Sequence, residues 1–220
     1  MANESLPIIE PYNPLDKKNI GNSIANELMS HDIQLLPPKP FIGAGVYAIF
    51  YIGNNDIYKA LADYNKTYNC AWPIYVGKAV PQGARKGVLG IDESQGQALQ
   101  KRLGDHAKSI IEAKDLNLED FRCRFIVIDD VWIPLAELLM ISRYRPVWNS
   151  LIDGFGNHDP GSGRKGQVQS PWDMLHPGRQ WAKKLPEGQN NQTYWRHLVQ
   201  LYFQENEPFR KQSSPSFHQS

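Results

Sequence analysis

The scarcity of strands constrains the fold of this chain more than any other feature. Only three segments of its 220 residues are rich in the β-branched and aromatic side chains that favour strands, namely residues 45–52, 74–76 and 121–128. Three strands are too few for a doubly wound sheet. The sequence therefore predicts an α+β fold in which helices flank a small sheet.

Segments with helical periodicity separate and follow these strands. Helices are predicted over residues 17–30, 57–68, 96–112, 133–144, 171–184 and 193–204. Residues 80–95 and 153–170 are rich in glycine and irregular, and residues 1–15 predict an arm.

Composition and charge exclude several classes of protein. A formal net charge of +1 argues against a histone-like protein or an acidic solvating chain, although a nucleic-acid enzyme with segregated charge remains open. The sequence has no secretory signal and no run of 18 apolar residues, so no membrane partner is expected. Cys70 and Cys123 fit no metal or disulfide spacing and predict buried thiols in a reducing cytoplasm.

Two of the predicted strands each place a tyrosine close to a glycine. The segments are Gly45-Val46-Tyr47 and Tyr75-Val76-Gly77. Tyrosines are common in sheets, so this pattern alone favours structural aromatics over functional ones. Whether the two tyrosines have a functional role depends on which side chains lie beside them.

The predicted helix over residues 96–112 carries an arginine and a histidine one turn apart. Arg102 and His106 lie on one helical face and border its apolar stripe, so neither is expected to point into open solvent. A satisfied core histidine and an arginine whose stem covers apolar surface are the structural alternatives.

Glu137 is the most unusual charged residue, because its neighbours at helical spacing are nearly all apolar. An ionised carboxylate is rarely buried without a partner or a metal. One alternative is an ion pair with an arginine of the third strand. The other is a Mg²⁺ site, since Mg²⁺ keeps most of its waters and takes few protein ligands.

These side chains favour phosphodiester hydrolysis over the other hydrolytic chemistries. The chain has no nucleophile elbow, no zinc-ligand spacing, no dinucleotide fingerprint and no phosphate-binding loop ending in Gly-Lys-Ser or Gly-Lys-Thr. An arginine, a divalent ion and a base of adjustable pKa suit attack on a phosphodiester.

In order and character the set resembles the GIY-YIG nuclease superfamily. The match covers about residues 43–150 and comprises Gly45-Val46-Tyr47, Tyr75-Val76-Gly77-Lys78, Arg102, His106, Glu137 and Asn149. Val46 and Val76 stand where the family has isoleucine. The two tyrosine motifs are farther apart than in the minimal module, which makes residues 53–72 an insertion after the first strand.

The chain resembles more closely the GIY-YIG type II restriction endonucleases that cut CCGCGG. The shared phrases include Asp153-Gly-Phe-Gly-Asn-His158 and His176-Pro-Gly-Arg179. This resemblance implies a three-stranded antiparallel sheet flanked by helices, one active site per subunit and a homodimer, with a tetramer left open. The implied organisation is an arm and helix over 1–40, a catalytic core over 41–150 and a helical extension over 151–220 that contacts DNA or dimerises.

The resemblance also implies a role for each site residue. Tyr47 activates the attacking water and His106 accepts its proton. Arg102 and Tyr75 stabilise the phosphate, Glu137 holds one Mg²⁺ per active site, and Asn149 orients nearby groups. Lys78 is a weaker candidate for phosphate contact, and the enzyme is expected in the bacterial cytoplasm.

The residues that read the DNA sequence are less clearly marked. A site made only of G·C pairs offers the O6 and N7 acceptors of guanine to arginine and lysine in the major groove. The candidate residues for contact with double-stranded DNA are Arg85, Lys86, Asn157, His158, Arg164 and Lys165. For the four charged residues, a solvated surface charge is the more ordinary interpretation. A homing or structure-specific repair nuclease, and a DNA-binding protein without catalysis, remain the alternative functions.

Overall fold

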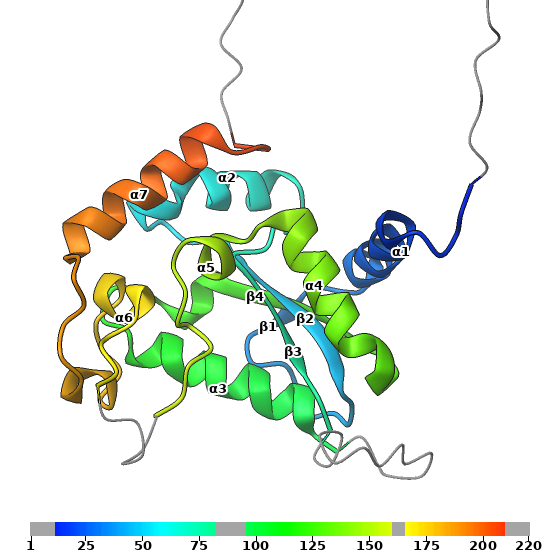
Figure 1. The fold of residues 1–220 in the computed structure, drawn as a ribbon, viewed down its shortest axis with the longest axis horizontal. Helices are drawn as coiled ribbons and strands as arrows, with labels where there is room; N and C mark the ends of the chain where they lie inside the picture. The colour runs from blue at the N-terminus through cyan, green and yellow to red at the C-terminus, as the bar shows by residue number, and fades with distance from the viewer. Residues whose placement is uncertain (1–11, 82–95, 160–165, 210–220) are drawn as a thin grey trace, which may run out of the picture.

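We describe the fold from a computed structural model, in which residues 12–81, 96–159 and 166–209 are described. At its centre is an antiparallel sheet of four strands in the order β1-β4-β2-β3. The strands are β1 (Gln34–Leu35), β2 (Gly45–Tyr51), β3 (Tyr75–Ala79) and β4 (Phe121–Val127). The prediction of a small sheet with helices around it is confirmed (Figure 1).

The predicted number of strands is wrong, because β1 was not expected. This strand is only two residues long and pairs with the start of β4, where Gln34 lies opposite Cys123. A strand this short shows no alternation that a sequence pattern could reveal. The three predicted strands correspond to β2, β3 and β4.

Most predicted helices are present with nearly the expected bounds. The α-helices are α1 (Lys17–Ser30), α2 (Lys59–Thr67), α3 (Ala98–Glu112), α4 (Ile133–Tyr144), α5 (Val147–Ser150), α6 (Pro171–Leu175) and α7 (Gln192–Glu205). The short helix α5 was not predicted. The helix expected over 171–184 is wrong: α6 ends at Leu175, before Pro177 and Gly178, and a 3₁₀ turn over Ala182–Lys184 follows.

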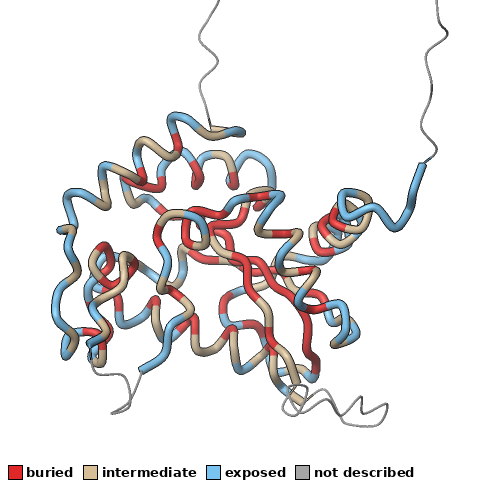
Figure 2. The backbone as a smooth tube through the Cα atoms, viewed as in Figure 1, coloured by how far each residue is buried: buried red, intermediate tan, exposed pale blue. Residues whose placement is uncertain are grey.

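The strand β2 is buried on both faces, and the two faces pack against different helices. Tyr47, Ile49 and Tyr51 contact the larger core cluster, to which α2, α3, α5, α6 and α7 contribute. Val46, Ala48 and Phe50 contact the smaller cluster, which includes residues of α1 and α4. Figure 2 shows the buried residues concentrated along these central strands.

Two expectations from composition can be compared with the described residues. Cys70 and Cys123 are buried free thiols, as predicted. None of the helices in the described segments is long and apolar enough to cross a membrane.

Candidate active site

An open cleft of about 1210 Å³ lies where β2 and β3 meet α3 and α4. Its lining brings together five of the residues predicted from the sequence and one predicted DNA contact: Tyr47, Tyr75, Lys78, Arg102, Glu137 and His158. Sequence reasoning missed Lys101 and Lys108, which also line the cleft from α3 and add positive charge. These two lysines are seven residues apart, about two turns of a helix, and that spacing was visible in the sequence.

Tyr47 and His106 form a hydrogen-bonded pair beside this cleft. The distance from the Tyr47 hydroxyl to Nε2 of His106 is 2.6 Å, and each residue is only 1% exposed. Gly77 lies opposite Tyr47 in the β2–β3 ladder. A Cβ on Gly77 would lie 2.4 Å from the Tyr47 hydroxyl, so the glycine leaves the space that this hydroxyl needs.

Burial keeps both members of this pair neutral in the free protein. It raises the pKa of Tyr47 well above its ordinary value, and the neighbouring Tyr75 raises it further while Arg102 opposes the shift. Burial also lowers the pKa of His106 well below its ordinary value, and the positive charge of Arg102 lowers it further. The imidazole is therefore an acceptor at neutral pH.

Arg102 is placed by the loop that follows α5. Its Nη2 donates to the carbonyl of Gly156 at 2.9 Å, and its Nη1 contacts Nε2 of His158. A Cβ on Gly156 would lie 2.8 Å from the Tyr75 hydroxyl and 2.9 Å from Nη2 of Arg102. The absence of a side chain at Gly156 thus allows the loop to approach both groups.

Glu137 forms an ion pair, as the structural alternative had it, but the partner is a lysine and not an arginine of the third strand. Nζ of Lys78 lies 2.5 Å from Oε2 of Glu137, and the two side chains are 39% and 22% exposed. The arginine Arg124 of β4 donates instead to the carbonyls of His31, Asn69 and Cys70. The position of Lys78 in its strand did not predict this pairing with Glu137.

The donor set in the cleft fits a Mg²⁺ that keeps most of its waters. Within the described residues, no group of three or more histidine, cysteine or acidic side chains is placed to enclose a metal. Glu137 offers carboxylate oxygens to the cleft, and Mg²⁺ is commonly held through one or two carboxylates together with substrate phosphate. Glu137 is therefore the residue that would hold the ion.

Asn149 acts on the strand β3 rather than in the cleft lining. Its Oδ1 accepts from the backbone N–H of Val76, and its Nδ2 donates to the carbonyl of the same residue, both at 2.8 Å. The amide thus makes the two backbone hydrogen bonds that a neighbouring strand would otherwise make to the residue after Tyr75. The orienting role expected of Asn149 in catalysis stays a prediction.

The predicted DNA contacts are only partly placed. His158 lines the cleft, and the carbonyl of Asn157 accepts a hydrogen bond from Arg179. The other four candidates, Arg85, Lys86, Arg164 and Lys165, lie outside the described residues.

Sequence reasoning missed Phe155 and Arg179 as parts of the site. The Phe155 ring stacks on the His106 imidazole at a centroid distance of 4.4 Å, and Arg179 is buried behind the same loop. Both residues belong to phrases noted for their resemblance to restriction endonucleases, which was the available signal.

Comparison with known proteins agrees with this geometry. A search of curated proteins found no match. The family model described as the Eco29kI GIY-YIG domain matches residues 39–203, which is more than half of the chain and contains every element of the site. The expected membership of the GIY-YIG superfamily is confirmed: the chain belongs to the Eco29kI GIY-YIG domain family, a family of restriction-endonuclease-like nucleases.

Proposed function

We propose that this protein is a type II restriction endonuclease that hydrolyses double-stranded DNA at a palindromic site, with CCGCGG as the first site to test. The observation that carries the proposal is the 2.6 Å hydrogen bond between Tyr47 and His106 beside a cleft that Arg102 also lines. Phosphodiester hydrolysis needs a proton acceptor for water and positive charge for the phosphate, and this arrangement supplies both.

Tyr47 serves as a proton relay in this mechanism. A lasting phenolate is unfavourable because burial raises the pKa of Tyr47 well above its ordinary value. Nε2 of His106 accepts the hydroxyl proton while the Tyr47 oxygen takes a proton from the attacking water. Negative charge developing on the phosphate offsets part of the cost of the buried imidazolium.

The phosphate is bound by groups around this pair. Arg102 and the hydroxyl of Tyr75 donate to its oxygens, and Lys101 and Lys108 attract the flanking backbone. When bound at Glu137, Mg²⁺ supplies a Lewis acid for this chemistry. Lys78 neutralises the Glu137 carboxylate in the free protein and is released toward phosphate when that carboxylate gains another partner.

The proposal includes a homodimer, because a two-fold protein matches a palindromic site and each subunit reads one half. Among the candidate DNA contacts, His158 lines the cleft and Asn157 precedes it in the chain, and the proposal keeps Arg85, Lys86, Arg164 and Lys165 as further candidates. The proposal places the enzyme in the bacterial cytoplasm, in contact with its DNA substrate.

Plasmid digestion tests the function directly. Two plasmids that differ only in one CCGCGG site are incubated with the protein in Mg²⁺ or in EDTA, and the ends are mapped. We expect a single discrete cut that needs both the site and Mg²⁺. Cuts at another sequence would reassign the specificity, preference for branched DNA would indicate a repair nuclease, and binding without cutting would indicate a non-catalytic protein.

Glu137→Ala tests the metal assignment. Cleavage is expected to fall by at least about 100-fold, because a Lewis acid contributes several kcal/mol to such reactions. Glu112→Ala is the matched control, since Glu112 is an exposed glutamate at the end of α3. Full cleavage by Glu137→Ala in Mg²⁺ would contradict the assignment.

A further inference from the structure

We infer that Arg179, outside the cleft, is a positioning residue of the nuclease site that acts through the loop of residues 153–158. The inference rests on the proposed function in that the loop is held against the two groups, Arg102 and His106, to which the proposal gives chemical roles. Arg179 lies in the C-terminal extension, after α6, and is 1% exposed.

Arg179 clamps the backbone of this loop from behind. Its Nη1 donates to the carbonyls of Phe155 and Asn157, each at 3.2 Å, and its Nη2 donates to the carbonyl of Gly154 at 2.9 Å. Three carbonyls of one tight loop therefore converge on a single planar guanidinium, whose fixed fork geometry lysine does not reproduce.

The guanidinium is itself immobilised. Its Nε donates to Oδ1 of Asp173 at 2.7 Å, and the Asp173 carboxylate is held in turn by the hydroxyl of Ser170 at 2.7 Å. The rings of Trp172 and Trp181 lie 4.5 and 4.7 Å from the guanidinium carbon. A buried arginine with a charge partner and two aromatic neighbours forms a rigid support.

The other side of the loop contacts the proposed chemical groups. The carbonyl of Gly156 accepts from Arg102, and the ring of His158 also contacts Arg102. The Phe155 ring stacks on His106 with an interplanar angle of 17°. Displacement of the loop would thus release the arginine and admit water to the histidine.

The expected kinetic consequence follows from that geometry. His106 faces the guanidinium groups of Arg102 and Arg179, the imidazole of His158, the hydroxyl of Tyr47 and the ring of Tyr75. Burial is the largest cause of its lowered pKa. If Phe155 no longer covers the imidazole, the pKa of His106 rises toward its ordinary value. As the pH falls, the imidazole is then protonated, and can no longer accept a proton, at a higher pH than in the wild type.

Arg179→Lys keeps the positive charge but removes the fork, so it separates geometry from electrostatics. We expect kcat for cleavage of the plasmid site to fall by about 100-fold with KM little changed, as for a small misplacement of reacting groups. We also expect the acid limb of the pH–rate profile to move to higher pH. The rate at each pH is divided by the fraction of folded protein at that pH, so that unfolding at low pH is not mistaken for a shift of the profile.

Arg124→Lys is the matched control. Arg124 is also a buried arginine that donates to three backbone carbonyls, but it lies on the opposite side of the sheet with the smaller core cluster. Its replacement is expected to leave the pH profile in place. If Arg179→Lys does not melt cooperatively, Asp173→Asn weakens the same clamp and should move the profile in the same direction.

Titration of the His106 ring followed by NMR in the wild-type chain and both loop-clamp variants gives a readout that does not need cleavage. A rise in the pKa of His106 in the variants supports the inference. Unchanged titration and unchanged kcat would overturn it even if the wild type cuts DNA. Failure of the wild type to cut any DNA would instead overturn the proposed function, with the titration still testing the clamp.

Discussion

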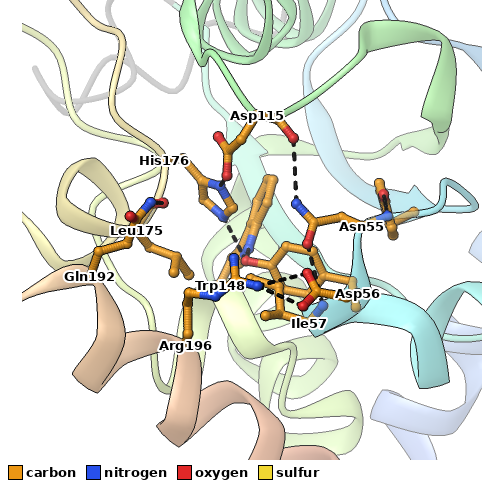
Figure 3. A network of polar contacts seen from close by, with 11 residues as sticks. Asn55, Asp56, Ile57, Asp115, Trp148, Leu175, His176, Gln192 and Arg196 are labelled. Carbon is orange, nitrogen blue, oxygen red and sulfur yellow. Dashed lines mark hydrogen bonds and ion pairs between the residues drawn. The ribbon is translucent and has the colours of Figure 1, made fainter.

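Two tyrosine–histidine pairs of equal length lie in different parts of this molecule. Tyr47 and His106 are 2.6 Å apart beside the cleft, and Tyr58 and His176 are 2.6 Å apart in the interior. Figure 3 shows the interior network, in which Asp115 is joined to His176 by a hydrogen bond of 2.9 Å. The same two side chains thus occur in very different surroundings.

The interior pair is enclosed by partners that satisfy it. Trp148 donates from Nε1 to the Tyr58 hydroxyl at 2.8 Å, while Asp115 accepts from Nδ1 of His176. Tyr58 and His176 are both 0% exposed, and neither lines the cleft that Tyr47 lines. This network joins the 3₁₀ turn before α2, the segment after α3 and the segment after α6, and so stabilises the packing of these three segments.

Among the described residues, the guanidinium of Arg102 lies beside the cleft pair, whereas the interior pair has the carboxylate of Asp115. Arg102 contributes to the pKa shifts of both Tyr47 and His106, and Tyr47 lines an open cleft. The comparison teaches that access to the cleft and a nearby guanidinium, rather than the hydrogen bond itself, distinguish a pair suited to chemistry. Four predictions test that distinction.

The largest effect is expected from Tyr47→Phe. Removing the hydroxyl breaks the proton relay, so plasmid cleavage should fall by about 10³-fold, within the range for general acid–base groups. Because Nε2 of His106 also loses its partner, the free energy of unfolding should fall by about 1–3 kcal/mol, so cleavage is compared under conditions in which both proteins are folded. Cleavage within a factor of a few of wild type would remove Tyr47 from the proposed mechanism.

Tyr58→Phe is the matched substitution at the interior pair. It leaves the buried Nε2 of His176 and Nε1 of Trp148 without the shared hydroxyl. We expect a loss of about 1–3 kcal/mol in the free energy of unfolding, measured by urea denaturation. Cleavage by the folded protein should be unchanged, and a specific loss of cleavage without a loss of stability would break the comparison.

The pH dependence of stability sharpens the description of the cleft pair. Because the pKa of His106 is lower in the folded than in the unfolded chain, the unfolded chain binds the extra proton as the pH falls. Stability should therefore decrease below about pH 6.5, with His106 contributing up to about 1.4 kcal/mol per pH unit. In His106→Gln that part of the slope should vanish in denaturant melts taken at several pH values, whereas an identical slope would contradict it.

The smallest effect is expected where the interior network reaches the surface. Arg196 of α7 donates to both carboxylate oxygens of Asp56, at 2.8 and 2.6 Å, but their side chains are 36% and 67% exposed. Screening by solvent limits such a pair, so Arg196→Ala should lower the unfolding free energy by less than about 1 kcal/mol. A larger loss in urea denaturation would show that α7 depends on this contact.

Local patterns predicted much of the fold and several members of the site. The helix over 133–144 and the strand at 45–52 could be recognised from the periodicity or composition of residues that are close together in the sequence. Arg102 and His106 were placed on one helical face for the same reason. Local patterns failed for the two-residue strand β1 and for the segment 176–184, where pairing with β4 and the Pro177-Gly178 break decide the structure.

The sequence by itself determined which chemical groups this protein has and which family its motifs match, because the identity and order of residues carry that information. Only the tertiary structure decided the partner of each group. Tyr47 and His106 are 59 residues apart, as are Lys78 and Glu137, and Arg179 reaches the site through a loop. Such pairings depend on how separate elements pack, so no local pattern distinguishes the Tyr47–His106 pair from the Tyr58–His176 pair.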